Sequence, residues 1–472
     1  MGLAVKSNAK LTPVCKTRAF SPPTGLERRP GLSASRRFPA TAGWNRLASR
    51  SDGCILTGMS AEIRRRSFPE NPKWRPAIAM LAIAAVPGGL AGGQLDVLVD
   101  NAVRTSLARL ERSVSEVGDP ALYPAYGTPQ LKWQLKSSAD WTSGFYPGCL
   151  WYAFEISRDR RFEGWARQWT AAIEQEKLNP ETHDLGFRFM CSFGNGLRLG
   201  RGPDYDRYPD ILRTAAATLA RRFNPRVGAL GSNWDLHPAG RSCPVIIDIM
   251  MNLDLLFWAA EHGGPPELAQ MARAHAMTTA RDFVRPDGGT YHVIRYDPDT
   301  GAIINRGTLQ GAGPETTWSR GHAWGLYGMV VVYRHTREQR FLDTARKLAD
   351  YFIRNLPADH VAPWDFQSDI KYRDVSATCI ATSALFEMIR YLDDAPLRAH
   401  YETEAEAMLA SLCQPPWFAT RTDTNCLLDH SVQFLPINSN VDVPAIFADY
   451  YFLEAIVRYR AWHAAAGRLG SK

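Results

Sequence analysis

The sequence predicts an all-α fold in which about six helical hairpins close into an α/α toroid, with a small β-hairpin near one mouth. Apolar residues recur every three or four positions in about twelve segments between residues 95 and 463, and this spacing places them on one face of each helix. Polar and aromatic clusters stand at the starts of alternate segments. In a closed ring of hairpins, all of these starts lie at the same end. A superhelical repeat is the alternative, but the chain carries no repeating residue signature.

The helical pattern begins with a stripe from Leu95 to Val114. Similar stripes predict helices at 145–156, 159–177, 184–199, 207–223, 244–262, 265–284, 316–335, 338–355, 374–392, 396–413 and 443–463. Two stretches have the pattern of β-strands instead. One covers 288–296, followed by a turn at 297–301 and a second strand, and the other lies near 227–234.

Residues 1–92 differ from the rest of the chain in composition. Residues 1–58 are rich in Ser, Pro, Gly and Arg without periodicity, which predicts a disordered leader. From Met59, basic residues precede a short apolar run at 77–86 and then small residues, the order of an export signal. We therefore expect a signal at 59–92, a folded domain at 93–472 and a periplasmic or secreted protein without a stable membrane anchor. A cytoplasmic location is the alternative.

Charge and cysteine patterns exclude several functions. The chain has a net charge of +7, but residues 1–92 hold 15 Lys and Arg against 4 Asp and Glu, which leaves −4 for 93–472. A nucleic-acid partner thereby loses its main support. The eight cysteines have no CxxC or metal-ligand spacing and predict buried free thiols. No motif calls for a metal or a nucleotide cofactor.

Two aspartates are candidates for catalysis. Asp248 lies in the apolar segment 244–253, where burial disfavours the ionised carboxylate and raises its pKa. Such a carboxylic acid can donate a proton near neutral pH; a helix cap or an arginine partner is the alternative role. Asp184 follows His183 at another helix start. Next to Asp248 at one mouth, Asp184 would be the second carboxylate of a glycosidase-type site.

Other side chains could bind a sugar beside these carboxylates. Four tryptophans could stack on sugar faces, with core filling as the rival role for each: Trp141, Trp234, Trp318 and Trp324. Arg320 could clamp a substrate carboxylate or form a structural ion pair. His292, Thr308 and Gln310, on or after the predicted β-hairpin, could hydrogen-bond ring hydroxyls.

These clusters together resemble the unsaturated glucuronyl hydrolases, glycoside hydrolase family 88. The matching motifs are WTSGFYPG (141–148), HDLGF (183–187), CSFGNGLRL (191–199), IIDIMMNLDLLFWA (246–259), TLQGAGPETTWSRGHAWGLYG (308–328) and VDVPAIFADYYFLEA (441–455). They follow the family order and span essentially 94–465. The resemblance implies an (α/α)6 barrel, in agreement with the helix pattern.

The resemblance also implies residue roles. Asp248 falls on the position of the general acid/base, and Asp184 on that of the second essential carboxylate. The positions of substrate contacts are occupied by Trp141, His183, His292, Thr308, Gln310, Arg320, Trp324 and, less clearly, Ser439. Ile249, Leu309 and His322 depart from the family pattern, which has Asn, His and Gln there, and this bears on substrate range rather than on reaction class.

The implied substrate is an oligosaccharide that ends in a 4,5-unsaturated uronic acid, which the enzyme removes by hydrating the C4=C5 vinyl ether. In this chemistry Asp184 binds ring hydroxyls and stabilises positive charge, and no glycosyl-enzyme is required. An unsaturated rhamnogalacturonyl hydrolase is the nearest alternative. A non-catalytic carbohydrate-binding barrel is the alternative of a different class.

Overall fold

The computed structural model describes residues 92–232, 242–465 and 467. The predicted leader, the export signal and Trp234 lie outside the described residues, so export and the domain boundary stay predictions. Mass spectrometry of the mature N-terminus tests both. In the part of the chain that the structure describes, no helix is both long enough and apolar enough to cross a membrane.

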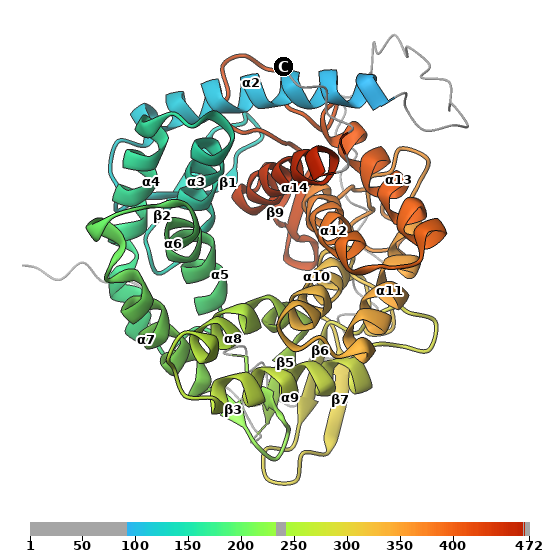
Figure 1. The fold of residues 1–472 in the computed structure, drawn as a ribbon. Coiled ribbons are helices and arrows are strands. Elements are labelled where there is room, and N and C mark those ends of the chain that lie inside the picture. Colours follow the sequence, from blue (N-terminus) through green and yellow to red (C-terminus); the bar gives the residue numbers. More distant parts are fainter. Residues whose placement is uncertain (1–91, 233–241, 466, 468–472) are drawn as a thin grey trace, which may run out of the picture. The chain divides into compact units, whose positions relative to one another are not determined.

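Within the described residues, six helical segments form an inner ring (Figure 1). They are α3 (Phe145–Ser157), α5 (Leu185–Phe189) continued through a π-turn by α6 (Asn195–Leu199), α8 (Leu253–Glu261), α10 (Ser319–Thr336), α12 (Val375–Met388) and α14 (Ile446–Ala465). Each segment packs on the next, and α14 packs back on α3, which closes the ring. Because inner helices have neighbours on all sides, they are largely apolar, and every residue of α12 is buried.

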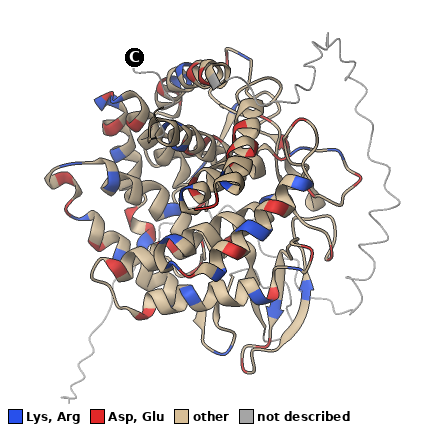
Figure 2. Ribbon diagram, turned by 45° about the vertical axis from the view of Figure 1, so that its right-hand side comes forward, with Lys and Arg blue, Asp and Glu red and all other residues tan. Residues whose placement is uncertain are grey.

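The outer ring consists of amphipathic helices, each preceding an inner one in the chain. They are α2 (Gly92–Val117), α4 (Arg160–Ala172), α7 (Tyr208–Ala220), α9 (Glu267–Asp282), α11 (Gln339–Arg354) and α13 (Ala395–Leu412). In α11, for example, Phe341, Ala345, Leu348 and Phe352 are buried on one face. Charged residues of both signs are interspersed along the helices (Figure 2). The predicted barrel of six hairpins is confirmed.

Small antiparallel sheets connect the hairpins. Their strands are β1 (Tyr123–Gly127) with β2 (Trp133–Lys136), β3 (Phe223–Asn224) with β4 (Ala229–Leu230), β5 (Cys243–Ile246) with β6 (Val293–Tyr296) and β7 (Ile303–Gly307), and β8 (Ser431–Phe434) with β9 (Ser439–Val443). The predicted hairpin is β6–β7, and β4 falls within the second predicted stretch. The sequence pattern missed β1, β2, β3, β5, β8 and β9.

One predicted helix was wrong at its start. Residues 244–252 were expected to be helical, but the chain forms β5 and then the 3-10 segment η4 (Ile247–Asn252) before α8 begins. The reason is tertiary: Val245 and Ile246 pair with Ile294 and Val293 of β6, and β-branched side chains suit a strand. The pairing places Asp248 in the first turn after the strand.

Candidate active site

Asp248 is a carboxylate held in a largely apolar setting. Its side chain is 15% exposed, and its Oδ2 atom is buried without a hydrogen-bond partner. Burial is the main reason that the pKa of Asp248 is raised to about 7; the positive charge of Arg320 opposes the rise, and the negative charge of Asp184 adds to it. Asp248 can therefore hold a proton near neutral pH and give it up.

Asp184 stands at the N-cap of α5, yet its side chain makes no capping bond. The side chain is 13% exposed, and its Oδ1 atom lies 3.4 Å from Nε2 of His183. The hydroxyl of Thr182 donates to Oδ2 at 3.3 Å. The capping role, which is the ordinary one for Asp at such a position, is not the one that this carboxylate takes.

Gly186 and Asn252 fix the two carboxylate-bearing segments against each other. A Cβ atom on Gly186 would lie 2.4 Å from Cα of Asn252, so only glycine permits this approach. The amide of Phe187 donates to Oδ1 of Asn252 at 3.0 Å. Sequence reasoning overlooked both residues, although they stand only two and four positions after Asp184 and Asp248.

His292 faces Asp248 with one particular ring nitrogen. Its Nδ1 accepts from the Thr308 hydroxyl at 3.1 Å and from the Leu309 amide at 3.2 Å, so the proton of the neutral ring resides on Nε2. Burial lowers the pKa of His292 to about 3, with a further contribution from Arg320. Nε2 lies 3.8 Å from Oδ2 of Asp248, and neither atom has a hydrogen-bond partner. The pair thus presents a donor and an acceptor that a bound molecule could join.

Arg320 forms the structural ion pair that was the alternative to a substrate clamp. It is 1% exposed, and its Nη1 lies 2.7 Å from Oδ2 of Asp374, the N-cap residue of α12. Nη1 also donates to the carbonyl of Val432, and Nη2 donates to the carbonyl of Gln433 at 2.8 Å. Both terminal nitrogens are therefore engaged. Arg320 ties α10, α12 and β8 together and sets positive charge near Asp248.

The tryptophans fall into two groups. Trp141 is half-buried and donates from Nε1 to the Tyr126 hydroxyl at 3.2 Å. Trp324 is fully buried and packs against Phe187 and Tyr451, so core filling describes its place in the structure. Trp318 is also buried. Of the described tryptophans that were expected at the site, Trp141 alone keeps accessible surface.

The remaining predicted residues line the same mouth or support it. Nδ1 of His183 lies 3.4 Å from Oγ of Ser232. Gln310 donates from Nε2 to the carbonyl of Gln433 at 2.7 Å, and Ser439 is the half-buried first residue of β9. His322 is different: its Nε2 donates to the carbonyl of Leu348 on α11 at 2.9 Å, so this departure from the family pattern lies behind the site.

A second aspartate, Asp449, shows that a raised pKa alone does not identify the acid. Burial raises its pKa to about 7 as well, but its two oxygens accept from the amides of Leu427 and Leu428 at 3.0 and 3.1 Å. Asp449 is committed to the backbone, whereas Asp248 keeps an unpaired oxygen. The unpaired oxygen makes Asp248 the better candidate for proton transfer.

Among the described residues, one group has the geometry of a metal site. Glu402, Glu406 and His463 offer ligand atoms within 4.8 Å of one another. They lie on α13 and near the end of α14, not with the two carboxylates at the starts of the inner helices.

An (α/α)6 barrel with two carboxylates at its mouth, one of them protonatable near neutral pH, defines a glycosidase-type site. No family model matches the chain. Among curated proteins, the unsaturated glucuronyl hydrolase of Formosa agariphila is 39% identical over 328 residues, which cover 68% of this chain and 80% of that protein. The unsaturated glucuronyl hydrolase of Bacillus sp. GL1 is 33% identical over 76% of this chain and 95% of that protein.

Solved structures agree with these relatives. An unsaturated glucuronyl hydrolase specific for heparin superposes with a TM-score of 0.73 at 36% identity, covering 78% of this chain and 98% of that one. A substituted unsaturated glucuronyl hydrolase of Streptococcus agalactiae, in complex with dGlcA-GalNAc6S, has a TM-score of 0.67 at 28% identity, covering 79% and 94%. The chain belongs to the unsaturated glucuronyl hydrolase family and is an enzyme of the glycosidase class, as the motifs predicted.

Proposed function

We propose that this enzyme removes the 4,5-unsaturated uronic acid from the non-reducing end of lyase-generated oligosaccharides, with Asp248 as the general acid and base. The observation that carries the proposal is the buried, unpaired Oδ2 of Asp248 with a pKa of about 7. A proton held there is available at neutral pH and has no protein partner to compete for it. Saccharide complexes of related structures support a substrate of this kind.

The reaction begins with protonation of the vinyl ether. Asp248 gives its proton to C4, and the electron pair of the C4=C5 bond forms the new C–H bond, which leaves positive charge on C5 and the ring oxygen. Water then adds at C5 and returns a proton to Asp248. The resulting hemiketal opens, and after rearrangement the neighbouring sugar leaves from C1, so that overall one water is consumed.

Asp184 and His292 have supporting roles in this scheme. The negative charge of Asp184 stabilises the cation on C5 and the ring oxygen, and its oxygens can accept from ring hydroxyls. The neutral His292 donates from Nε2, the nitrogen that the structure leaves unpaired. Thr308 acts through His292, because its hydroxyl donates to the opposite ring nitrogen.

The other predicted residues surround these groups. We propose that Trp141, His183, Gln310 and Ser439 contact the substrate directly, because each comes from a segment at the mouth. Arg320 and Trp324 support that layer from behind, since both are fully buried. Trp234 remains a predicted contact.

The test follows the near-ultraviolet absorbance of unsaturated uronides, which hydration destroys. A panel of lyase-generated unsaturated disaccharides, including pectin-derived ones, identifies the polysaccharide source and separates glucuronyl from rhamnogalacturonyl specificity. Asp248→Asn is expected to lower turnover by about 10²–10⁴-fold with the fold intact, the usual contribution of general acid catalysis. Near-normal turnover of this variant would remove Asp248 from the mechanism.

Asp449→Asn is the matched control. Asp449 has a similarly raised pKa, but it accepts hydrogen bonds from backbone amides and does not contact Asp248 or His292. The turnover of Asp449→Asn should therefore equal that of the unchanged enzyme. Absence of activity on every disaccharide, with retained sugar binding, would favour the non-catalytic barrel.

A further inference from the structure

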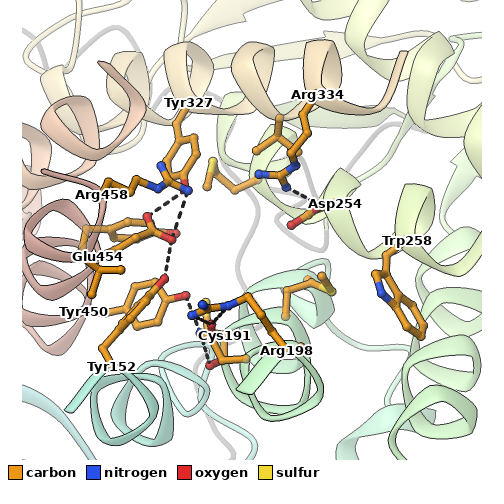
Figure 3. A pocket seen from close by; sticks show the side chains of 18 of the residues that line it. Tyr152, Cys191, Arg198, Asp254, Trp258, Tyr327, Arg334, Tyr450, Glu454 and Arg458 are labelled. Carbon is orange, nitrogen blue, oxygen red and sulfur yellow. Dashed lines mark hydrogen bonds and ion pairs between the residues drawn. The ribbon is translucent and has the colours of Figure 1, made fainter. Parts of the chain in front are cut away.

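A cavity of about 940 Å³ opens at the end of the barrel where the inner helices finish. Figure 3 shows its walls, which come from α3, the α5–α6 segment, α8, α10 and α14. Asp184 and Asp248 stand at the starts of inner segments, and therefore at the other end. Neither carboxylate is among the residues that line the cavity, whereas Phe187 lines it and also packs on Trp141 and Trp324.

The polar groups of the wall are held in fixed positions. Glu454 accepts from the hydroxyls of Tyr152, Tyr327 and Ser383 at 2.6 to 2.8 Å. Arg458 pairs with Glu454 from the next turn of α14 at 3.5 Å. Groups that are already ordered lose little freedom when a ligand binds, which favours binding.

The cavity is lined by four arginines, Arg198, Arg334, Arg390 and Arg458, and by three carboxylates, Glu155, Asp254 and Glu454. In their ion pairs the guanidinium is more exposed than the carboxylate: the Arg198 side chain is 45% exposed against 17% for Glu155, and Arg458 is 18% exposed against 9% for Glu454. The Arg334 side chain is 31% exposed, against 20% for Asp254 and 3% for Glu387. Arg198 also donates to Asn195, and Arg334 and Arg458 each meet two carboxylates. Unlike Arg320, however, these three side chains are partly exposed, and a guanidinium has five donors, so each can still meet a further anion.

Trp258 adds an aromatic surface. Its ring stacks on His262, with centroids 4.3 Å apart and planes 8° from parallel, and it lines the cavity in a half-buried state (Figure 3). A flat ring beside guanidinium groups and fixed hydroxyls suits a ligand with apolar faces, many hydroxyls and negative charge. The volume is at the upper end of ordinary small-ligand pockets, which leaves room for more than one sugar ring.

We propose that this cavity is a second, non-catalytic binding site for an acidic saccharide. The ring of Trp258 would carry a sugar face, and Arg198, Arg334 and Arg458 would meet its carboxylate or sulfate groups. The site does not depend on the reaction at Asp248, and its test does not require turnover.

The experiment is calorimetric titration of the full chain at low ionic strength. The probes are a saturated uronate-containing tetrasaccharide without sulfate, the same tetrasaccharide with sulfate, and a neutral glucose tetrasaccharide. None of them has the C4=C5 bond, so none is consumed. We expect the acidic probes to bind more tightly than the neutral one, and we expect added salt to weaken the binding of the acidic probes. The ratio between the two acidic probes shows whether carboxylate or sulfate is the preferred anion.

Two variants and two controls locate the binding. Trp258→Ala and Arg198→Gln should each weaken the acidic probes by about tenfold, the loss of about 1.4 kcal/mol, while turnover of unsaturated disaccharides stays unchanged. Trp165→Ala and Arg160→Gln change a half-buried tryptophan and an exposed arginine of α4, outside the cavity, and should bind as before. Equal affinity for neutral and acidic probes, or unchanged affinity in both cavity variants that fold normally, overturns the proposal.

Discussion

Asp248→Asn should stabilise the protein at alkaline pH while it abolishes the chemistry. The folded protein holds the pKa of Asp248 at about 7, against 3.8 for an unperturbed aspartate. Because the raised value means that the folded state binds this proton more tightly than the unfolded state, stability falls as pH rises between about 4 and 7. Asparagine does not ionise, so the variant does not lose stability in this way as the pH rises.

The size of the effect follows from the two pKa values. The difference in pKa between the folded and unfolded states lowers the stability of the folded state by about 2 kcal/mol at pH 5 and by about 4 kcal/mol at pH 8, because each pKa unit is worth about 1.36 kcal/mol. The side chain is only 15% exposed, so solvent screens this cost little. The stability gained by Asp248→Asn should therefore grow by about 2 kcal/mol from pH 5 to pH 8.

Urea unfolding of both proteins at pH 5, 6, 7 and 8 measures this growth. All other titrating groups are shared, so they cancel in the difference between variant and unchanged protein. Control measurements on Ser431→Ala, which changes a buried polar side chain that does not titrate, should show a difference that is constant with pH. A pH-independent difference for Asp248→Asn would refute the raised pKa and, with it, the reason for choosing Asp248 as the acid.

Three further predictions concern the same site. The value of kcat/KM should fall about tenfold per pH unit above pH 7, because the acid is then ionised; a profile still rising at pH 8 contradicts this. Gly186→Ala should lower the free energy of unfolding by about 1–3 kcal/mol, since its Cβ would overlap Asn252. An unchanged urea unfolding curve would show that the two segments can move apart without loss of stability. Thr308→Val should lower turnover by about tenfold through misorientation of His292, and Thr308→Ser, which keeps the hydroxyl, should retain turnover. Loss of turnover in both variants would contradict the role of the hydroxyl in orienting His292.

Much of the fold could be predicted because it depends on local pattern. The stripe of Phe341, Leu342, Ala345 and Leu348 identifies α11 as an outer helix without knowledge of its neighbours. The largely apolar α12 could likewise be recognised as helical. The order of such segments leaves few arrangements other than a closed ring of hairpins.

The arrangement of the site needed contacts between distant parts of the chain. The sequence left Arg320 open as a substrate clamp or a structural ion pair, and Asp374 and the carbonyl groups of β8 beside it favour the ion pair. A backbone carbonyl leaves no mark in the sequence, so no spacing rule could predict these bonds. In the same way, His322 faces α11 because of a carbonyl there.

The sequence by itself determined the barrel, its six hairpins and Asp248 and Asp184 as the candidate carboxylates, because amphipathic periodicity and a charge in an apolar run are local properties. Only the tertiary structure decided that Asp248 follows a strand, that it keeps an unpaired oxygen facing His292, and that the more deeply buried Asp449 accepts hydrogen bonds from backbone amides. The physical reason is that desolvation and hydrogen bonding depend on what surrounds a group in space, and those neighbours come from segments far apart in the chain.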